Sequence, residues 1–216
     1  MIQSIEAIGF DAYGTLFDVG SAGWAAPEVM ATARTKQLQY SWLMSLMGQY
    51  ADFHEVTRAA IEYALEQHHT TAGPIEEIMA AQTRVPIYAE VPEALDLCAP
   101  RRLAIVSNGH PDSLEAMAAN AGIRDRLDLL VSAHNVRIYK PAPAVYQLAA
   151  DAFEVHFGVP KDRWLFVSSN GWDAAGAAQF GLRVAWVNRS GLPRERIGGE
   201  PEVVVPNLLE LAEQLS

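Results

Sequence analysis

The sequence has little cysteine, few basic residues and no long apolar run. Cys98 is the single cysteine among 216 residues, which excludes an internal disulfide and a cysteine metal cluster. The 16 lysines and arginines face 26 acidic residues and form no basic block, so nucleic acid is not an expected partner. No stretch approaches the ~20 apolar residues of a membrane span, and the N-terminus lacks the pattern of a signal peptide. We therefore expect a globular protein of the reducing cytoplasm without a membrane segment.

Half of the residues are hydrophobic, and their spacing changes along the chain. A short apolar run at 4–10 predicts a buried strand that ends at Asp11. Helical periodicity follows over 27–47, 51–69 and 74–83, without a convincing strand. From Pro92 onward helices and strands alternate, and Asp112 is expected to cap the helix that ends before Gly122.

Alternating strands and helices predict an α/β fold with a parallel sheet and helices on both faces. The expected organisation is a Rossmann-like core, residues 1–18 and 92–216, with a helical cap, residues 19–91, inserted after the first strand. Polar residues follow four of the predicted strands, in the segments 11–15, 107–109, 139–141 and 168–173. Ligands bind at the carboxyl edge of an open parallel sheet, so four such segments favour a functional site there over ordinary helix capping.

Four motifs occur in the order "DAYGTLFD", "SNG", "YKPAPAVY" and "VSSNGWD". Together with "ARTKQLQYSWLMSLMG" in the cap segment, they resemble the haloacid dehalogenase superfamily, and in particular its (S)-2-haloacid dehalogenase (type II) branch. The resemblance spans nearly the whole chain. It implies hydrolysis of a short 2-haloalkanoic acid with inversion at C2, using water, without a metal or cofactor. In that branch the segment before Arg34 is longer and a tryptophan precedes the arginine, where this chain has Ala33.

The resemblance also implies the residues that perform the reaction. Asp11 would attack C2, Lys140 would keep Asp11 ionised, and Asp173 would activate the water that hydrolyses the ester, with Asn170 positioning it. Thr15, Ser107 and Ser168 would bind the substrate carboxylate or steady Asp11. Arg34, Asn108 and Trp172 would hold the departing halide, with Tyr146 near the site. The expected apolar wall consists of Tyr13, Leu38 and Phe53.

Tyr13 argues against the chemistry most common in this superfamily. Its phosphatases carry a second aspartate two residues after the nucleophile and bind Mg²⁺, which prefers oxygen ligands. An alkoxide leaving group needs a proton, whereas a halide leaves without one. Replacement of that aspartate by Tyr13 is therefore tolerable for dehalogenation and damaging for phosphoryl transfer.

Two other functions stay open, a Mg²⁺-dependent phosphatase of the same fold and a catalytically silent binding protein. His68 and His69 are adjacent and do not face each other on a helix, so we interpret them as a solvated helix end. The Met- and Leu-rich stretch 41–48 is either cap core or a dimer contact, and we expect a homodimer.

Overall fold

The computed structural model describes residues 4–215. Six strands form one sheet in the order β3-β2-β1-β4-β5-β6, and every neighbouring pair is parallel. The strands are β1 (Ala7–Phe10), β2 (Arg102–Ser107), β3 (Leu129–Ser132), β4 (Trp164–Ser168), β5 (Arg183–Val187) and β6 (Val203–Val205). The helices are α1 (Pro27–Leu46), α2 (Phe53–Gln67), α3 (Ile75–Ala81), α4 (Val91–Cys98), α5 (Pro111–Asn120), α6 (Pro143–Phe157), α7 (Gly171–Phe180) and α8 (Leu208–Leu215). The predicted α/β fold with an inserted helical cap is confirmed; the first strand is shorter than predicted.

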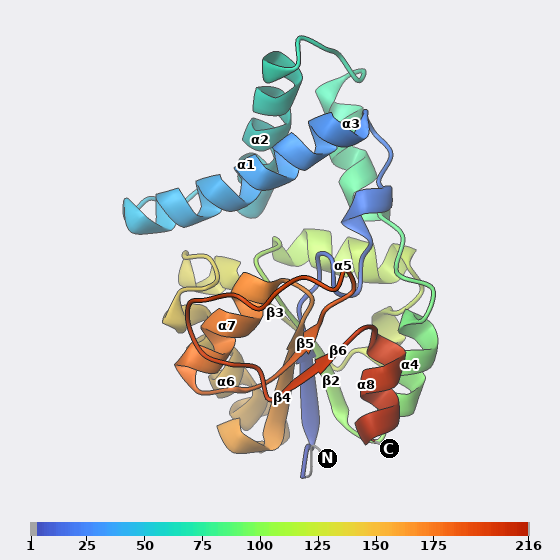
Figure 1. The fold of residues 1–216 in the computed structure, drawn as a ribbon, viewed down its shortest axis with the longest axis vertical. Coiled ribbons are helices and arrows are strands. Elements are labelled where there is room, and N and C mark those ends of the chain that lie inside the picture. The colour runs from blue at the N-terminus through green and yellow to red at the C-terminus, as the bar shows by residue number, and fades with distance from the viewer. Residues whose placement is uncertain (1–3, 216) are drawn as a thin grey trace.

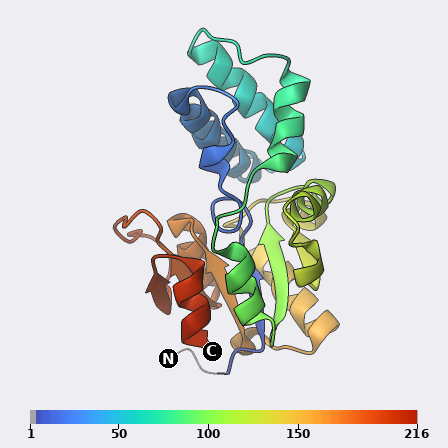
Figure 2. The ribbon, with the colours of Figure 1, turned by 90° about the vertical axis from the view of Figure 1, so that its right-hand side faces the viewer.

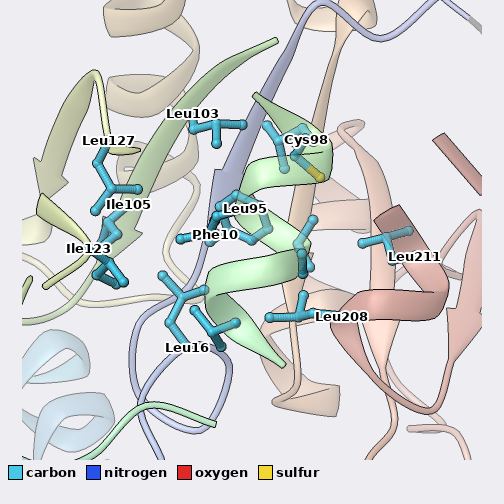
Figure 3. Close-up of a cluster of buried hydrophobic side chains, with 14 of the residues drawn as sticks. Phe10, Leu16, Leu95, Cys98, Leu103, Ile105, Ile123, Leu127, Leu208 and Leu211 are labelled. Carbon is cyan, nitrogen blue, oxygen red and sulfur yellow. The ribbon is translucent and has the colours of Figure 1, made fainter. Parts of the chain in front are cut away.

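Alternating strand residues build a separate apolar layer on each face of the sheet. Ile8 and Phe10 of β1 belong to a cluster that also contains residues of α4, α5 and α8. Figure 3 shows Phe10 of this cluster with Leu95 of α4 and Leu208 of α8. Ala7 belongs to the cluster on the other face, which packs against α6 and α7. Gly9 of β1 lets the rings of Trp164 and Phe153 pack closely against the strand, because a Cβ at this position would lie 3.0 Å from the Trp164 ring and 3.2 Å from Phe153. This packing buries β1 completely and fixes the position of Asp11, which follows it.

Helices α1, α2 and α3 lie above the carboxyl edge of the sheet, as Figures 1 and 2 show. They have an apolar core of their own, which includes Val29, Ile61 and Met79. A second cluster joins this cap to the sheet domain, because Phe53 and Val56 of α2 pack against Tyr139 and Tyr13. The cap therefore covers the end of β1 from which Asp11 projects.

Two linkers connect the cap to the core, and they pair with each other. The backbone N–H of Asp18 donates to Pro86, and that of Tyr88 donates to Leu16. Arg189, which follows β5, binds both linkers. Its guanidinium donates to Glu90 Oε1 at 2.5 Å and to the Thr15 carbonyl at 2.9 Å, and lies 3.7 Å from the centroid of the Tyr88 ring.

Several smaller predictions can be compared with the structure. Cys98 is buried, and burial raises the pKa of its thiol to about 11, so it is a core residue as predicted. The prediction that Asp112 caps α5 is wrong, because Pro111 starts the helix and His110 occupies the cap position, accepting from the Asp112 backbone N–H. His68 directly follows the last residue of α2, and its ring pairs with the Thr32 hydroxyl. No helix among residues 4–215 has the length and apolar character to cross a membrane.

Candidate active site

Asp11 follows β1 directly and is held by three side chains. Its Oδ1 accepts a hydrogen bond from the Lys140 ammonium at 2.8 Å. Its Oδ2 accepts from the Asn170 amide at 2.8 Å and from the Thr15 hydroxyl at 3.2 Å. The backbone N–H of Asp11 donates to Val167 of β4, which extends the sheet pairing to the site. The carboxylate is thus fixed in orientation while only 4% of the residue is exposed.

Lys140 is a buried cation shared between two carboxylates. Besides Asp11, its ammonium donates to Asp173 Oδ2 at 2.6 Å and to the Val106 carbonyl at 3.1 Å. Burial acts to lower the pKa of Lys140, but the charges of Asp11 and Asp173 outweigh it and raise the pKa above its usual value. Lys140 therefore stays charged and compensates the burial of both acids.

Asp173 lies in the first turn of α7 and is completely buried. Its Oδ2 also accepts from the Ser168 hydroxyl at 3.0 Å, and its Oδ1 accepts from the Tyr146 hydroxyl at 2.7 Å. Burial raises the pKa of Asp173 above its usual value, although Lys140 opposes the shift. A carboxylate of raised pKa is a better proton acceptor than an ordinary aspartate, so Asp173 is suited to the role of a base.

Arg34 and Tyr13 form the boundary between this charged cluster and the cap. Arg34 of α1 donates to Gln37 Oε1 at 2.6 Å, and Gln37 in turn donates to Thr57 of α2. Burial lowers the pKa of Arg34, while the negative charge of Asp11 raises it, so the two side chains interact electrostatically. Burial raises the pKa of the Tyr13 phenol. The phenol therefore stays protonated, and Tyr13 does not supply the negative charge of a second aspartate.

A cavity of about 380 Å³ lies between cap and core beside Tyr13 and Arg34. The rings of Tyr13 and Phe53, 5.5 Å apart, form part of its wall, as predicted. The predicted wall residue Leu38 is not among the residues that line it. Gln37, one residue earlier on α1, lines the cavity instead.

The remaining predicted residues occupy two kinds of position. Asn108 accepts from the Lys140 backbone N–H at 2.9 Å, and Ser107 accepts from Gly109, so both shape the loops around the site. Trp172 packs edge-on against Trp42 of the cap, with ring centroids 5.3 Å apart, and does not line the cavity. Asn170, predicted to position water for Asp173, donates directly to Asp11 and to the Tyr13 carbonyl.

The sequence analysis missed some residues that support the site. Gln37 follows Arg34 by three positions, a helical spacing that could have identified it as the partner of the guanidinium. Thr57, which binds Gln37, lies on another helix and left no sequence signal. Within residues 4–215, no group of three or more His, Cys, Asp and Glu residues is arranged to hold a metal ion.

A buried Asp–Lys–Asp cluster at the carboxyl edge of a capped parallel sheet lies where ligands bind in such folds, and it holds an oriented carboxylate of the kind that enzymes with a carboxylate nucleophile require. The chain belongs to the haloacid dehalogenase-like hydrolases, whose family model matches residues 5–181. This confirms the resemblance inferred from the motifs.

Similar proteins indicate the branch of the family. The (S)-2-haloacid dehalogenase of Pseudomonas sp. (strain YL) is 39% identical, over 97% of this chain and 94% of that protein. Haloacetate dehalogenase H-2 of Moraxella sp. (strain B) is 37% identical, over 95% of each chain. The structure of L-2-haloacid dehalogenase from Xanthobacter autotrophicus with chloropropionic acid covalently bound superposes with a TM-score of 0.88 at 38% identity, over 97% of each chain.

Proposed function

We propose that this protein hydrolyses short (S)-2-haloalkanoic acids to (R)-2-hydroxy acids through an ester on Asp11. The observation that carries the proposal is the Asp11 carboxylate, fixed by Lys140, Thr15 and Asn170, with Tyr13 where a second acid would stand. Relatives that match nearly the full chain carry the name (S)-2-haloacid dehalogenase, which supports the same activity. Residues 1–18 and 92–216 would form the catalytic core, and residues 19–91 the cap.

In the first step an Asp11 oxygen attacks C2 from the side opposite the halogen. The carbon–halogen bond breaks as the new C–O bond forms, and the halide leaves with the bonding electrons. Arg34 would stabilise the outgoing anion, because a guanidinium offers charged and directional donors. No proton is needed at this step, which fits a site where Tyr13 replaces the usual acid. One displacement at C2 inverts its configuration.

In the second step water attacks the carbonyl carbon of the Asp11 ester. Asp173 would take a proton from this water, and its raised pKa favours that transfer. The ester C–O bond then breaks at the aspartyl carbon, the product oxygen takes a proton, and the Asp11 carboxylate is restored. The net products are the hydroxy acid, a halide ion and one proton. Lys140 would stay charged throughout and hold Asp11 in place.

The direct test is chloride release from each enantiomer of 2-chloropropionate in the presence of EDTA. We expect release from the (S) enantiomer, and a loss of ~10³-fold or more in kcat for Asp11→Ala. Asp11→Asn belongs beside it, because slow deamidation of the asparagine would restore activity with time. Asp112→Asn is the matched control, since the Asp112 side chain is 95% exposed, and it should leave kcat unchanged.

A phosphatase would give the opposite result. Phosphoester cleavage that requires Mg²⁺ and stops in EDTA, without halide release, would overturn the proposal. Saturable ligand binding without turnover of either class would indicate a binding protein. We further propose that the enzyme works in the cytoplasm, because a chain with one buried cysteine forms no internal disulfide and fits a reducing compartment. We also propose that it is a homodimer.

A further inference from the structure

Tyr139 belongs to the sheet domain but packs its side chain among residues of the cap. It lies in the segment between β3 and α6, directly before Lys140, and is 1% exposed. Its ring is buried with Phe53 of α2, in a cluster that also contains Tyr50 and Ala51 of the loop between α1 and α2. The residue next to the buried cation is therefore held by the cap.

Two hydrogen bonds join Tyr139 to the cap. Its hydroxyl donates to the Ala51 carbonyl at 2.5 Å, and its backbone N–H donates to Ser45 Oγ of α1 at 3.2 Å. The Ser45 hydroxyl in turn donates to the Ser41 carbonyl, so its proton is engaged and its oxygen is available as the acceptor. The backbone N–H and the hydroxyl of Tyr139 thus both depend on cap residues for their hydrogen bonds.

Aromatic contacts add a second connection between this segment and the cap. The Tyr139 ring stacks on Tyr50, with 5.5 Å between the centroids and 28° between the planes, and lies 5.7 Å from the Phe53 ring. The Tyr50 hydroxyl pairs with Nδ1 of His134, which belongs to the same segment as Tyr139, at 2.9 Å. The segment before Lys140 is therefore joined to the loop between α1 and α2 at two residues.

Lys140 takes its position from contacts on two sides. Its backbone N–H donates to Asn108 of the sheet domain at 2.9 Å, whereas the residue before it is bound to the cap. Its ammonium contacts Asp11 at 2.8 Å and Asp173 at 2.6 Å. Because Coulomb attraction weakens with distance, a shift of the Lys140 backbone would weaken its interaction with both acids.

We propose that Tyr139 is a positioning residue, which couples the placement of the cap to the placement of the Lys140 ammonium between the two acids. The inference rests on the proposed function and adds to it a residue that acts through Lys140. With the cap in place, Ser45 and Ala51 hold Tyr139, and the ammonium stays within bonding distance of both carboxylates. When these contacts are lost, the ammonium moves and no longer keeps the acids fully ionised.

The test is the pH dependence of kcat for chloride release from (S)-2-chloropropionate by Tyr139→Leu. Lys140 opposes the rise in the pKa of Asp173, so a displaced ammonium lets that pKa rise further. Asp173 must be ionised to act as the base, so the acid limb of the profile should move to higher pH. The expected shift is roughly 0.5–1 pH unit, a part of the effect of a close opposite charge. A loss of folded protein alone would lower the amount of active enzyme and leave the limb in place.

Other titratable side chains also face these acids. Arg34 and Tyr13 interact with the charge of Asp11, and Tyr146 donates to Asp173. The variants alter none of them, so a shift of the limb reports on Lys140.

Two milder variants each remove a single contact. Tyr139→Phe loses the hydroxyl that binds Ala51, and Ser45→Ala removes the cap acceptor of the Tyr139 N–H. Each should move the acid limb in the same direction by a smaller amount. The matched controls are Tyr63→Leu, at a tyrosine of α2 that is 37% exposed, and Ser190→Ala, at an exposed serine after β5. Both should leave the limb in place.

The outcomes separate the positioning role from the activity itself. If the unaltered protein releases chloride but the limb stays in place in Tyr139→Leu, or in both milder variants, the positioning role is wrong and the dehalogenase activity stands. Should Tyr139→Leu fail to fold, the two milder variants decide the question. Absence of chloride release by the unaltered protein would overturn the proposed function and this role together.

Discussion

The positive charge of Lys140 offsets the repulsion between two buried carboxylates and so allows them to lie close together. Its ammonium contacts Asp11 at 2.8 Å and Asp173 at 2.6 Å, and all three residues are at most 4% exposed. The two acids differ in their other partners. Asp11 is bound by Asn170 and Thr15, whereas Asp173 is bound by Ser168 and Tyr146. This difference supports separate roles, nucleophile for Asp11 and base for Asp173.

Tyr146 gives a test of the proposed base through the pH dependence of kcat. Its hydroxyl donates to the ionised form of Asp173, which lowers the pKa of that carboxyl against the raising effect of burial. Asp173 must be ionised to accept a proton, so activity is present above its pKa and is lost as the pH falls through it. Tyr146→Phe removes the donor and raises the pKa further, so the acid limb of the kcat profile should move to higher pH.

The control for this measurement is Tyr63→Phe, which alters an exposed tyrosine of α2 and should leave the acid limb in place. An acid limb that stays where it is in Tyr146→Phe would show that Asp173 does not control the pH dependence of the limiting step.

At the scale of helices and strands, the sequence predicted the parts of the site that depend on periodicity and order. Asp11, Lys140 and Asp173 each follow a strand, and strands of a parallel sheet end at one edge, so their convergence was predictable. The packing of Trp172 on Trp42 was not, because it depends on where a cap helix meets the core. The cap of α5 was misassigned for a local reason, since Pro111 can start a helix and leaves the capping position to His110.

Arg189 stabilises the two linkers between cap and core by binding to both of them. Its side chain joins Glu90 in one linker to Thr15 in the nucleophile loop, with a side-chain exposure of only 16%. Arg189→Met should lower the free energy of unfolding by about 1–3 kcal/mol, because the Glu90 carboxylate and the Thr15 carbonyl lose their donor. Urea denaturation measures this change, and a double-mutant cycle with Glu90→Gln should show coupling between the two residues.

Arg194→Met is the matched control, since Arg194 pairs with Glu200 on an exposed loop, and no measurable change is expected. Equal stability of Arg189→Met and the unaltered protein would contradict the structural role of Arg189.

At the scale of the whole molecule, the C-terminal end of α1 presents apolar side chains to solvent. Leu43, Leu46 and Met47 are 45%, 84% and 60% exposed, and this end of the helix projects to the left in Figure 1. Exposed apolar groups that gather at one place favour association. If the homodimer uses this end, the pair Leu46→Glu and Met47→Glu should convert it to a monomer, as measured by light scattering after gel filtration.

Val155→Glu serves as the control for this experiment, because Val155 is 80% exposed on α6, away from the cap, and should leave the dimer intact. A molar mass near 23.6 kDa for the unaltered protein would contradict the homodimer directly.

The central claim, a covalent ester on Asp11, is tested most directly by a single turnover in ¹⁸O-labelled water with enzyme in excess over (S)-2-chloropropionate. If Asp11 attacks C2, the new hydroxyl oxygen of lactate comes from the unlabelled carboxylate. Mass spectrometry should then find the label in the peptide that contains Asp11 and none in the product hydroxyl. Label in the product hydroxyl after this first turnover would mean that water attacks C2 itself, and the account would be wrong.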